Sequence, residues 1–268
     1  MKKTVQYRNA VLAYHVYGSG IPVLLLHGFG ETSSIWKQQT EYLSRNCMLV
    51  IPDLPGSGES ELPGMNGSNL EIGTLADCIL SVINNENIKQ CIMLGHSMGG
   101  YVTLSFAEKY PGKLIAFGFV HSTAFADSDA KKQDRAKGIE AINLNGSYAF
   151  LKKMLPGLFA DEFKKENPAV IDALIEEGKH FSKTSLQQYY YAMMERPDTT
   201  GVLKNSKLPV LFVIGTEDQA APLNDLLKQV SLPEIAYIHI IPAVAHMSML
   251  EAPEILNGIL KSFINALD

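Results

Sequence analysis

Short apolar runs alternate with helix-type patterns along most of the chain. Residues 23–27, 48–51 and 91–94 are nearly continuous apolar runs, which are typical of strands buried on both faces of a parallel sheet. Helical patterns separate these runs, so the order of elements predicts crossover helices covering a mostly parallel sheet. Residues 4–17, interrupted once by polar side chains, predict an antiparallel hairpin at the start of the sheet.

This rhythm changes after the strand predicted at residues 114–120. No strand-like run occurs between about residues 122 and 206, where helical patterns dominate. These patterns lie at residues 150–155, 170–177 and 186–194. Strand patterns then resume at residues 209–214 and 235–241, and an amphipathic helix is predicted over 253–267. We therefore predict one core domain, residues 1–121 and 207–268, with residues 122–206 as a helical insertion.

Composition and charge narrow the classes of protein and partner. The chain has 268 residues, of which 46% are hydrophobic, enough for one large core. Its net charge is −5 and no basic run is longer than a pair, so we expect no nucleic-acid partner. The three cysteines lack CxxC spacing and are predicted to be buried, reduced thiols. Polar residues at 6–9 interrupt any signal-peptide pattern, and no apolar run is long enough to cross a membrane, so a cytoplasmic protein without membrane association is expected.

A glycine-flanked serine is the first candidate for chemistry. Gly95-His96-Ser97-Met98-Gly99 fits the pattern G-x-S-x-G and lies between the apolar run at 91–94 and a helix predicted over 98–109. Such a strand-turn-helix junction forms a nucleophile elbow, in which glycines allow close backbone approach and the serine lies near a helix N-terminus. We predict that Ser97 is a nucleophile.

A serine hydroxyl needs a base, and the base needs an acid that orients it. Both must follow strands, at the carboxyl edge of the sheet where the elbow lies. His246 follows the last predicted strand by a short loop, so we predict that it is the base. Glu217 and Asp218 follow the strand at 209–214, and their placement alone does not separate them. His121 ends the strand after the elbow and is a candidate pocket-lining residue.

Acyl transfer also needs hydrogen-bond donors for the developing oxyanion. The backbone N–H of Met98, directly after the serine, is one predicted donor. The turn His27-Gly28-Phe29-Gly30 follows the first apolar run, and the N–H of Phe29 is the second predicted donor. This chemistry requires no cofactor, and the histidines lack metal-site spacing, so no metal is expected.

These motifs together resemble the α/β-hydrolase superfamily, in particular its small esterase, lactonase, haloperoxidase-like and carbon–carbon hydrolase branch. Further matches are at residues 53–60, 215–218 and 245–246, and they follow the family order. The resemblance implies an α/β-hydrolase fold with a mostly parallel eight-stranded sheet flanked by helices. It also implies that Asp218, rather than Glu217, is the acid, and that residues 122–206 form a helical cap.

The cap decides the substrate, and it carries many aromatic and methionine side chains, among which Tyr189 and Met193 are candidate pocket-lining residues. We predict a small to medium, largely apolar carboxylic ester, thioester or lactone, cleaved through an acyl-enzyme by a carboxylesterase-like enzyme (EC 3.1.1). One alternative keeps the triad but hydrolyses a carbon–carbon bond or acts as a lyase. Another is a ligand-sensing receptor on the same fold. The sequence leaves the oligomeric state open.

Overall fold

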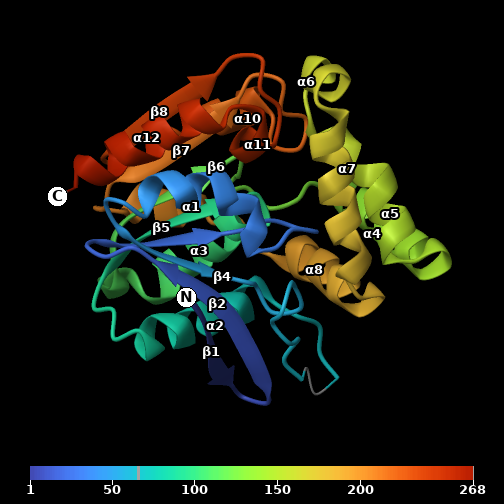
Figure 1. Cartoon of the computed structure of the whole chain (residues 1–268), viewed down its shortest axis with the longest axis horizontal. Coiled ribbons are helices and arrows are strands. Elements are labelled where there is room, and N and C mark those ends of the chain that lie inside the picture. Colours follow the sequence, from blue (N-terminus) through green and yellow to red (C-terminus); the bar gives the residue numbers. More distant parts are fainter. Residues whose placement is uncertain (65–66, 268) are drawn as a thin grey trace.

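A computed structural model describes residues 1–64 and 67–267 (Figure 1). Its centre is one eight-stranded sheet in the order β1-β2-β4-β3-β5-β6-β7-β8. The strands are β1 (Lys2–Tyr7), β2 (Ala10–Tyr17), β3 (Pro22–Leu26), β4 (Met48–Pro52), β5 (Cys91–His96), β6 (Leu114–Val120), β7 (Val210–Gly215) and β8 (Ala236–Ile241). The predicted fold, a mostly parallel eight-stranded α/β sheet, is confirmed.

Only β2 runs against the other strands. β1 pairs with β2, and β2 with β4, in antiparallel register, whereas all later pairs are parallel. The chain runs from β3 outward to β4 and then returns past β3 to β5, so the direction of winding reverses at β3. A reversal of this kind opens a crevice at the carboxyl ends of the strands, where ligands bind in open α/β sheets.

Helices flank the sheet in two layers. The α-helices are α1 (Lys37–Leu43), α2 (Ile72–Asn85), α3 (Met98–Lys109), α4 (Asp129–Asn145), α5 (Ser147–Met154), α6 (Asp161–Glu166), α7 (Pro168–Glu177), α8 (Lys183–Glu195), α9 (Thr200–Asn205), α10 (Leu223–Leu227), α11 (Ser248–Glu251) and α12 (Pro253–Asn265). Short 3₁₀ turns occupy Ser33–Trp36, Pro111–Lys113, Leu155–Leu158 and Gly178–His180. Helix α1 packs with α12, and α2 packs with α3. Since crossovers are right-handed, the reversal at β3 places α1 and α2 on opposite faces of the sheet.

The segment between β6 and β7 is helical, and Figure 1 shows α4 to α7 grouped to one side of the sheet with α8 beneath them. Helix α4 has 17 residues and was not among the predicted helices. Only Gly138 and Ile142 of α4 are buried, so the helix carries almost no apolar periodicity from which it could be found. The division into a core and a cap remains a prediction built on this arrangement.

The core lies between the sheet and its helices. Every residue of β5 and β7 is buried, which explains why these strands have continuous apolar sequences. The three cysteines are free and buried, as predicted, and burial raises the pKa of each thiol. Among the described residues, no helix has the length and apolar character needed to cross a membrane.

Candidate active site

Ser97 occupies a strained turn between β5 and α3. Its backbone has φ 48° and ψ −115°, a conformation that side chains disfavour. Two glycines allow this turn: a Cβ on Gly95 would lie 2.2 Å from the carbonyl of Gly99, and one on Gly99 would lie 2.5 Å from the carbonyl oxygen of Leu26. The side chain of Ser97 therefore stands at the N-terminus of α3, as a nucleophile elbow requires.

Asp218 and His246 meet at the same edge of the sheet. His246 Nδ1 lies 2.8 Å from Asp218 Oδ2, and the carboxylate's second oxygen accepts the N–H groups of Ala220 and Ala221, each at 2.8 Å. Burial raises the pKa of Asp218, but the neighbouring histidines outweigh burial and hold this pKa well below its usual range. Asp218 is therefore ionised, whereas Glu217 is exposed to solvent. The geometry favours Asp218 over Glu217 as the partner of His246.

His121 does not occupy the position predicted for it. We expected a pocket-lining side chain, but His121 is fully buried and its Nδ1 lies 3.2 Å from Asp218 Oδ2. Its backbone has φ 53° at the end of β6, and its ring centroid lies 5.7 Å from that of His246. Burial lowers the pKa of His121 to about 4, so the ring is neutral and donates its Nδ1–H to Asp218. Asp218 is consequently held by two imidazoles, which the sequence did not predict.

A second buried pair, His96 and Glu31, joins the turn at residues 27–30 to His246. We call this turn, which carries the predicted oxyanion donor Phe29, the oxyanion turn. His96 Nε2 donates to the backbone oxygen of His246 at 2.9 Å, and His96 Nδ1 lies 3.0 Å from Glu31 Oε2. The same Glu31 oxygen accepts the N–H of Gly28 at 2.7 Å. Both ring nitrogens of His96 face acceptors, so the ring is protonated when Glu31 is ionised.

The pKa shifts of this pair agree with the hydrogen bonds. Burial lowers the pKa of His96, but the Glu31 carboxylate outweighs burial and raises it above its ordinary value. Burial raises the pKa of Glu31, but His96 outweighs it and lowers the pKa. Sequence reasoning named no role for Glu31 and only noted His96 as part of the turn. The available signal was an acid directly after the turn at residues 27–30.

The turn that carries Phe29 rests on the elbow. A Cβ on Gly28 would lie 3.1 Å from the Cβ of Ser97, so the two turns are in direct contact. His27 Nε2 accepts the N–H of Leu54 at 2.9 Å, which leaves the proton on Nδ1 to donate to the carbonyl of Gly28 at 2.8 Å.

Two backbone N–H groups beside Ser97 are free to bind an anion. Those of Phe29 and Met98 donate to no other group among the described residues. Both therefore remain available as the predicted oxyanion donors.

Ser97 and His246 line one cavity of about 230 Å³, which we call the Ser97 cavity. Its apolar walls include Phe29, Met154, Leu158, Tyr190 and Met193, and its charged lining comprises Glu31, Lys131, Asp134 and Arg135. The cavity is thus more polar than the predicted apolar pocket, since three of these four charged residues come from α4, a helix that the sequence did not predict.

Of the two candidates on α8, Met193 lines this cavity and Tyr189 does not. Tyr189 is fully buried, and its hydroxyl lies 2.7 Å from Ser57 Oγ and 2.8 Å from the backbone oxygen of Pro55. Its neighbour Tyr190 stacks on Phe29 at 4.4 Å between ring centroids. Adjacent helical residues point about 100° apart, so an error of one residue changes which ring faces Ser97.

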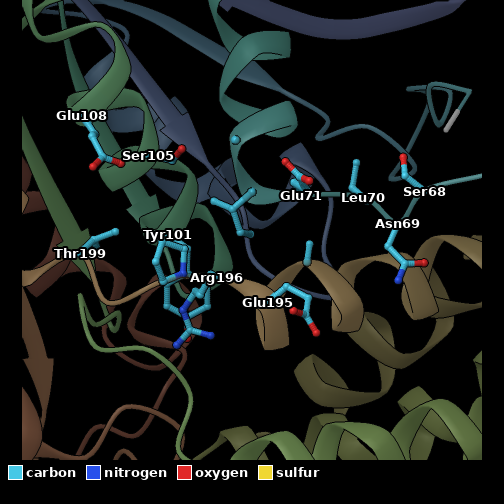
Figure 2. Close-up of a pocket in the computed structure, with 14 residues that line it drawn as sticks. Ser68, Asn69, Leu70, Glu71, Tyr101, Ser105, Glu108, Glu195, Arg196 and Thr199 are labelled. Atoms are coloured by element: carbon cyan, nitrogen blue, oxygen red, sulfur yellow. The ribbon is translucent and has the colours of Figure 1, made fainter. Parts of the chain in front are cut away.

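A larger cavity of about 480 Å³, which we call the side cavity, lies between residues 68–73, α3 and the end of α8. Figure 2 shows Tyr101 and Arg196 stacked together at one end of it, with Ser68, Asn69, Leu70 and Glu71 toward the other. Tyr101 lines both the side cavity and the Ser97 cavity.

Three buried side chains also have the chemistry of metal ligands. The ligand atoms of His121, Asp218 and His246 all lie within 4.8 Å of one another. Asp218 Oδ2 is already the acceptor of both imidazoles, so hydrogen bonding is sufficient to hold this arrangement together.

Comparison with known proteins identifies the family. The structure is similar to that of a thermophilic esterase from Thermogutta terrifontis with malate bound, with a TM-score of 0.92 over 100% of this chain and 99% of the esterase, at 25% identity. The acetyltransferase component of the acetoin cleaving system of Pseudomonas putida is 27% identical over 91% of this chain, and Protein ABHD8 of Homo sapiens is 26% identical over 91%. This chain spans only 64% and 55% of these two relatives. The model of the Alpha/beta hydrolase family matches residues 23–258, so the chain belongs to the alpha/beta hydrolase family.

Proposed function

We propose that this protein is a serine hydrolase that cleaves carboxylic esters, thioesters or lactones through an acyl-enzyme. The observation that carries the proposal is the hydrogen bond between the ionised Asp218 and His246, which lines the same cavity as the strained Ser97. The similar esterase from Thermogutta terrifontis supports ester chemistry over the other reactions of the family.

In the proposed mechanism, Ser97 Oγ attacks the substrate carbonyl and its proton passes to His246 Nε2. Asp218 accepts the Nδ1–H of His246, which fixes the tautomer and stabilises the imidazolium. The N–H groups of Phe29 and Met98 bind the oxyanion. The tetrahedral intermediate then expels the alcohol or thiol, which takes the proton from His246. Water repeats the sequence on the acyl-enzyme and releases the acid.

The Ser97 cavity also suggests which esters are preferred. Its volume of about 230 Å³ favours short acyl groups, and its aromatic and methionine walls accept apolar ones. Arg135 is paired with Asp127, whereas Lys131 donates one hydrogen bond to the backbone oxygen of Ala220 at 2.8 Å and keeps its charge at the cavity. We therefore propose that Lys131 allows esters bearing an additional acid group to be tolerated. The malate bound to the similar esterase is consistent with this second property.

Active-site labelling tests the proposal directly. A fluorophosphonate should label the protein at Ser97, and Ser97→Ala should abolish labelling and the hydrolysis of p-nitrophenyl acetate and butyrate. Labelling without turnover of any ester in the panel would favour the alternatives, a carbon–carbon hydrolase or a lyase with the same triad. Failure to label a folded protein would refute an activated serine, and tight ligand binding without either reaction would favour a receptor.

A further inference from the structure

Tyr101 separates two cavities of very different size. It lies one helical turn beyond Ser97 on α3, is only 8% exposed, and lines both the Ser97 cavity and the side cavity. The side cavity, at about 480 Å³, is roughly twice the volume of the Ser97 cavity at about 230 Å³. A phenol ring therefore forms the partition between the proposed nucleophile and a larger space.

The ring of Tyr101 is held in place from one side. The guanidinium carbon of Arg196 lies 3.8 Å from the ring centroid, which is close cation–π contact. Arg196 is itself fixed, since it donates to the backbone oxygens of Met193 at 2.7 Å and Phe125 at 2.9 Å and pairs with Asp127 at 2.8 Å. Rotation of Tyr101 out of this position would require the loss of that contact, so the partition is rigid.

The side cavity has the lining expected of an extension for an acyl chain. Its buried part is formed by the apolar side chains of Leu70, Ile72 and Ala192, by the Tyr101 ring and by the buried side chain of Arg196 that stacks on this ring. The glutamates that line it, Glu71, Glu108 and Glu195, are exposed and lie at its rim. An apolar chain that entered past residue 101 would contact Leu70, Ile72 and Ala192 and leave the glutamates in water, while the guanidinium of Arg196 stays paired with Asp127 and with backbone oxygens.

We propose that Tyr101 sets the upper length of the acyl group by closing the side cavity to Ser97, and that the side cavity is a latent subsite for longer unbranched acyl chains. This inference rests on the proposed ester hydrolysis. It assigns Tyr101 a role in specificity and none in the bond-making steps.

Removal of the ring should open the side cavity to substrate. For Tyr101→Ala, kcat/KM for p-nitrophenyl octanoate should rise at least tenfold relative to that for the butyrate, because each methylene that gains an apolar contact contributes about fourfold. Tyr101→Phe keeps the ring and should retain the wild-type ratio. An equal loss on both esters, with no change in their ratio, would show that residue 101 has a structural role only and would overturn the proposal.

A blocking variant provides a matched control. Ser105 lies one turn beyond Tyr101 on α3 and lines only the side cavity, so Ser105→Leu should leave butyrate hydrolysis unchanged. Added to Tyr101→Ala, it should remove the gain on the octanoate by filling the opened space. Retention of the gain in the double variant would place the longer chain elsewhere and refute the subsite.

Binding without turnover separates this inference from the proposed reaction. Octanoate and butyrate can be titrated by calorimetry into Ser97→Ala and into Ser97→Ala combined with Tyr101→Ala. Octanoate should gain at least tenfold in affinity from the second substitution, and butyrate should not. If the wild-type protein hydrolyses no ester, the proposed function fails while this titration still decides the role of Tyr101. If octanoate gains nothing, the partition fails whatever the enzyme hydrolyses.

Discussion

Glu31→Gln tests whether the buried pair with His96 holds the oxyanion turn in place. One oxygen, Glu31 Oε2, accepts both the Gly28 N–H and the His96 Nδ1–H, and the two side chains are 1% and 0% exposed. A glutamine cannot replace it in either orientation. Its oxygen at that position faces an imidazolium without a compensating charge, and its NH₂ group faces the N–H of Gly28.

The magnitude follows from burial. Removal of one partner of a buried ion pair costs about 3–5 kcal/mol, and a buried unsatisfied donor costs about 1–3 kcal/mol. Deprotonation of His96 relieves the first cost in part, so we expect Glu31→Gln to lower the free energy of unfolding by about 3 kcal/mol. A shift of the turn by a fraction of an ångström moves the Phe29 N–H, and we expect a loss of about 10- to 100-fold in kcat.

Urea unfolding and steady-state hydrolysis of p-nitrophenyl butyrate measure these two effects. A boronic acid that mimics the tetrahedral intermediate should lose about as much affinity as kcat, whereas butyrate binding should change little, because the oxyanion that the Phe29 N–H binds forms only during the reaction. Glu217→Gln, on an exposed residue, is the control and should change neither quantity. Unfolding within 0.5 kcal/mol of wild type together with unchanged kcat would refute the reasoning.

Three further predictions concern the same region. Asp218→Asn should lower kcat by about 10⁴ in the butyrate assay because His246 loses its orienting acceptor, whereas an effect under tenfold would exclude Asp218 as the acid. The stability that Glu31 contributes should be present above pH 4.5 and be lost as pH falls through its lowered pKa, and that of His96 should be present below pH 6.5 and be lost as pH rises through its raised pKa. The difference in unfolding free energy between wild type and Glu31→Gln should therefore be greatest between about pH 4.5 and 6.5, and a difference independent of pH from 3 to 9 would argue against an ion pair. Prolonged treatment with EDTA should leave ester hydrolysis unchanged, and activity lost to EDTA and restored by zinc would instead make the His121, Asp218 and His246 cluster a metal site.

The sheet could be predicted because burial on two faces leaves a continuous apolar run in the sequence. Residues 114–120 and 98–109 were predicted with the bounds that β6 and α3 have in the structure. Helix α4 could not be predicted from the sequence, since only two of its residues are buried and its sequence is polar on nearly every side.

In the candidate site, too, the residues with a local sequence pattern could be predicted, whereas contacts between residues far apart in the sequence could not. Ser97, Asp218 and His246 could be named because each follows a strand, and parallel strands bring those positions to one edge. The contact between Glu31 and His96 joins a loop to the end of β5 across 65 residues of sequence, and no local pattern specifies it. Which of Tyr189 and Tyr190 faces the Ser97 cavity depends on the rotation of α8 about its axis. To predict that rotation, the helix bounds would have to be known to within a single residue.

The backbone of Ser97, at φ 48° and ψ −115°, lies in a region where glycine would relax and serine cannot. Occupying it costs on the order of 1–3 kcal/mol. A Ser97→Gly protein should therefore melt at a higher temperature than the wild type even though it has lost its hydroxyl. Serine at this position lowers the thermal stability of the protein but supplies the reactive hydroxyl, so selection for stability alone would replace the serine.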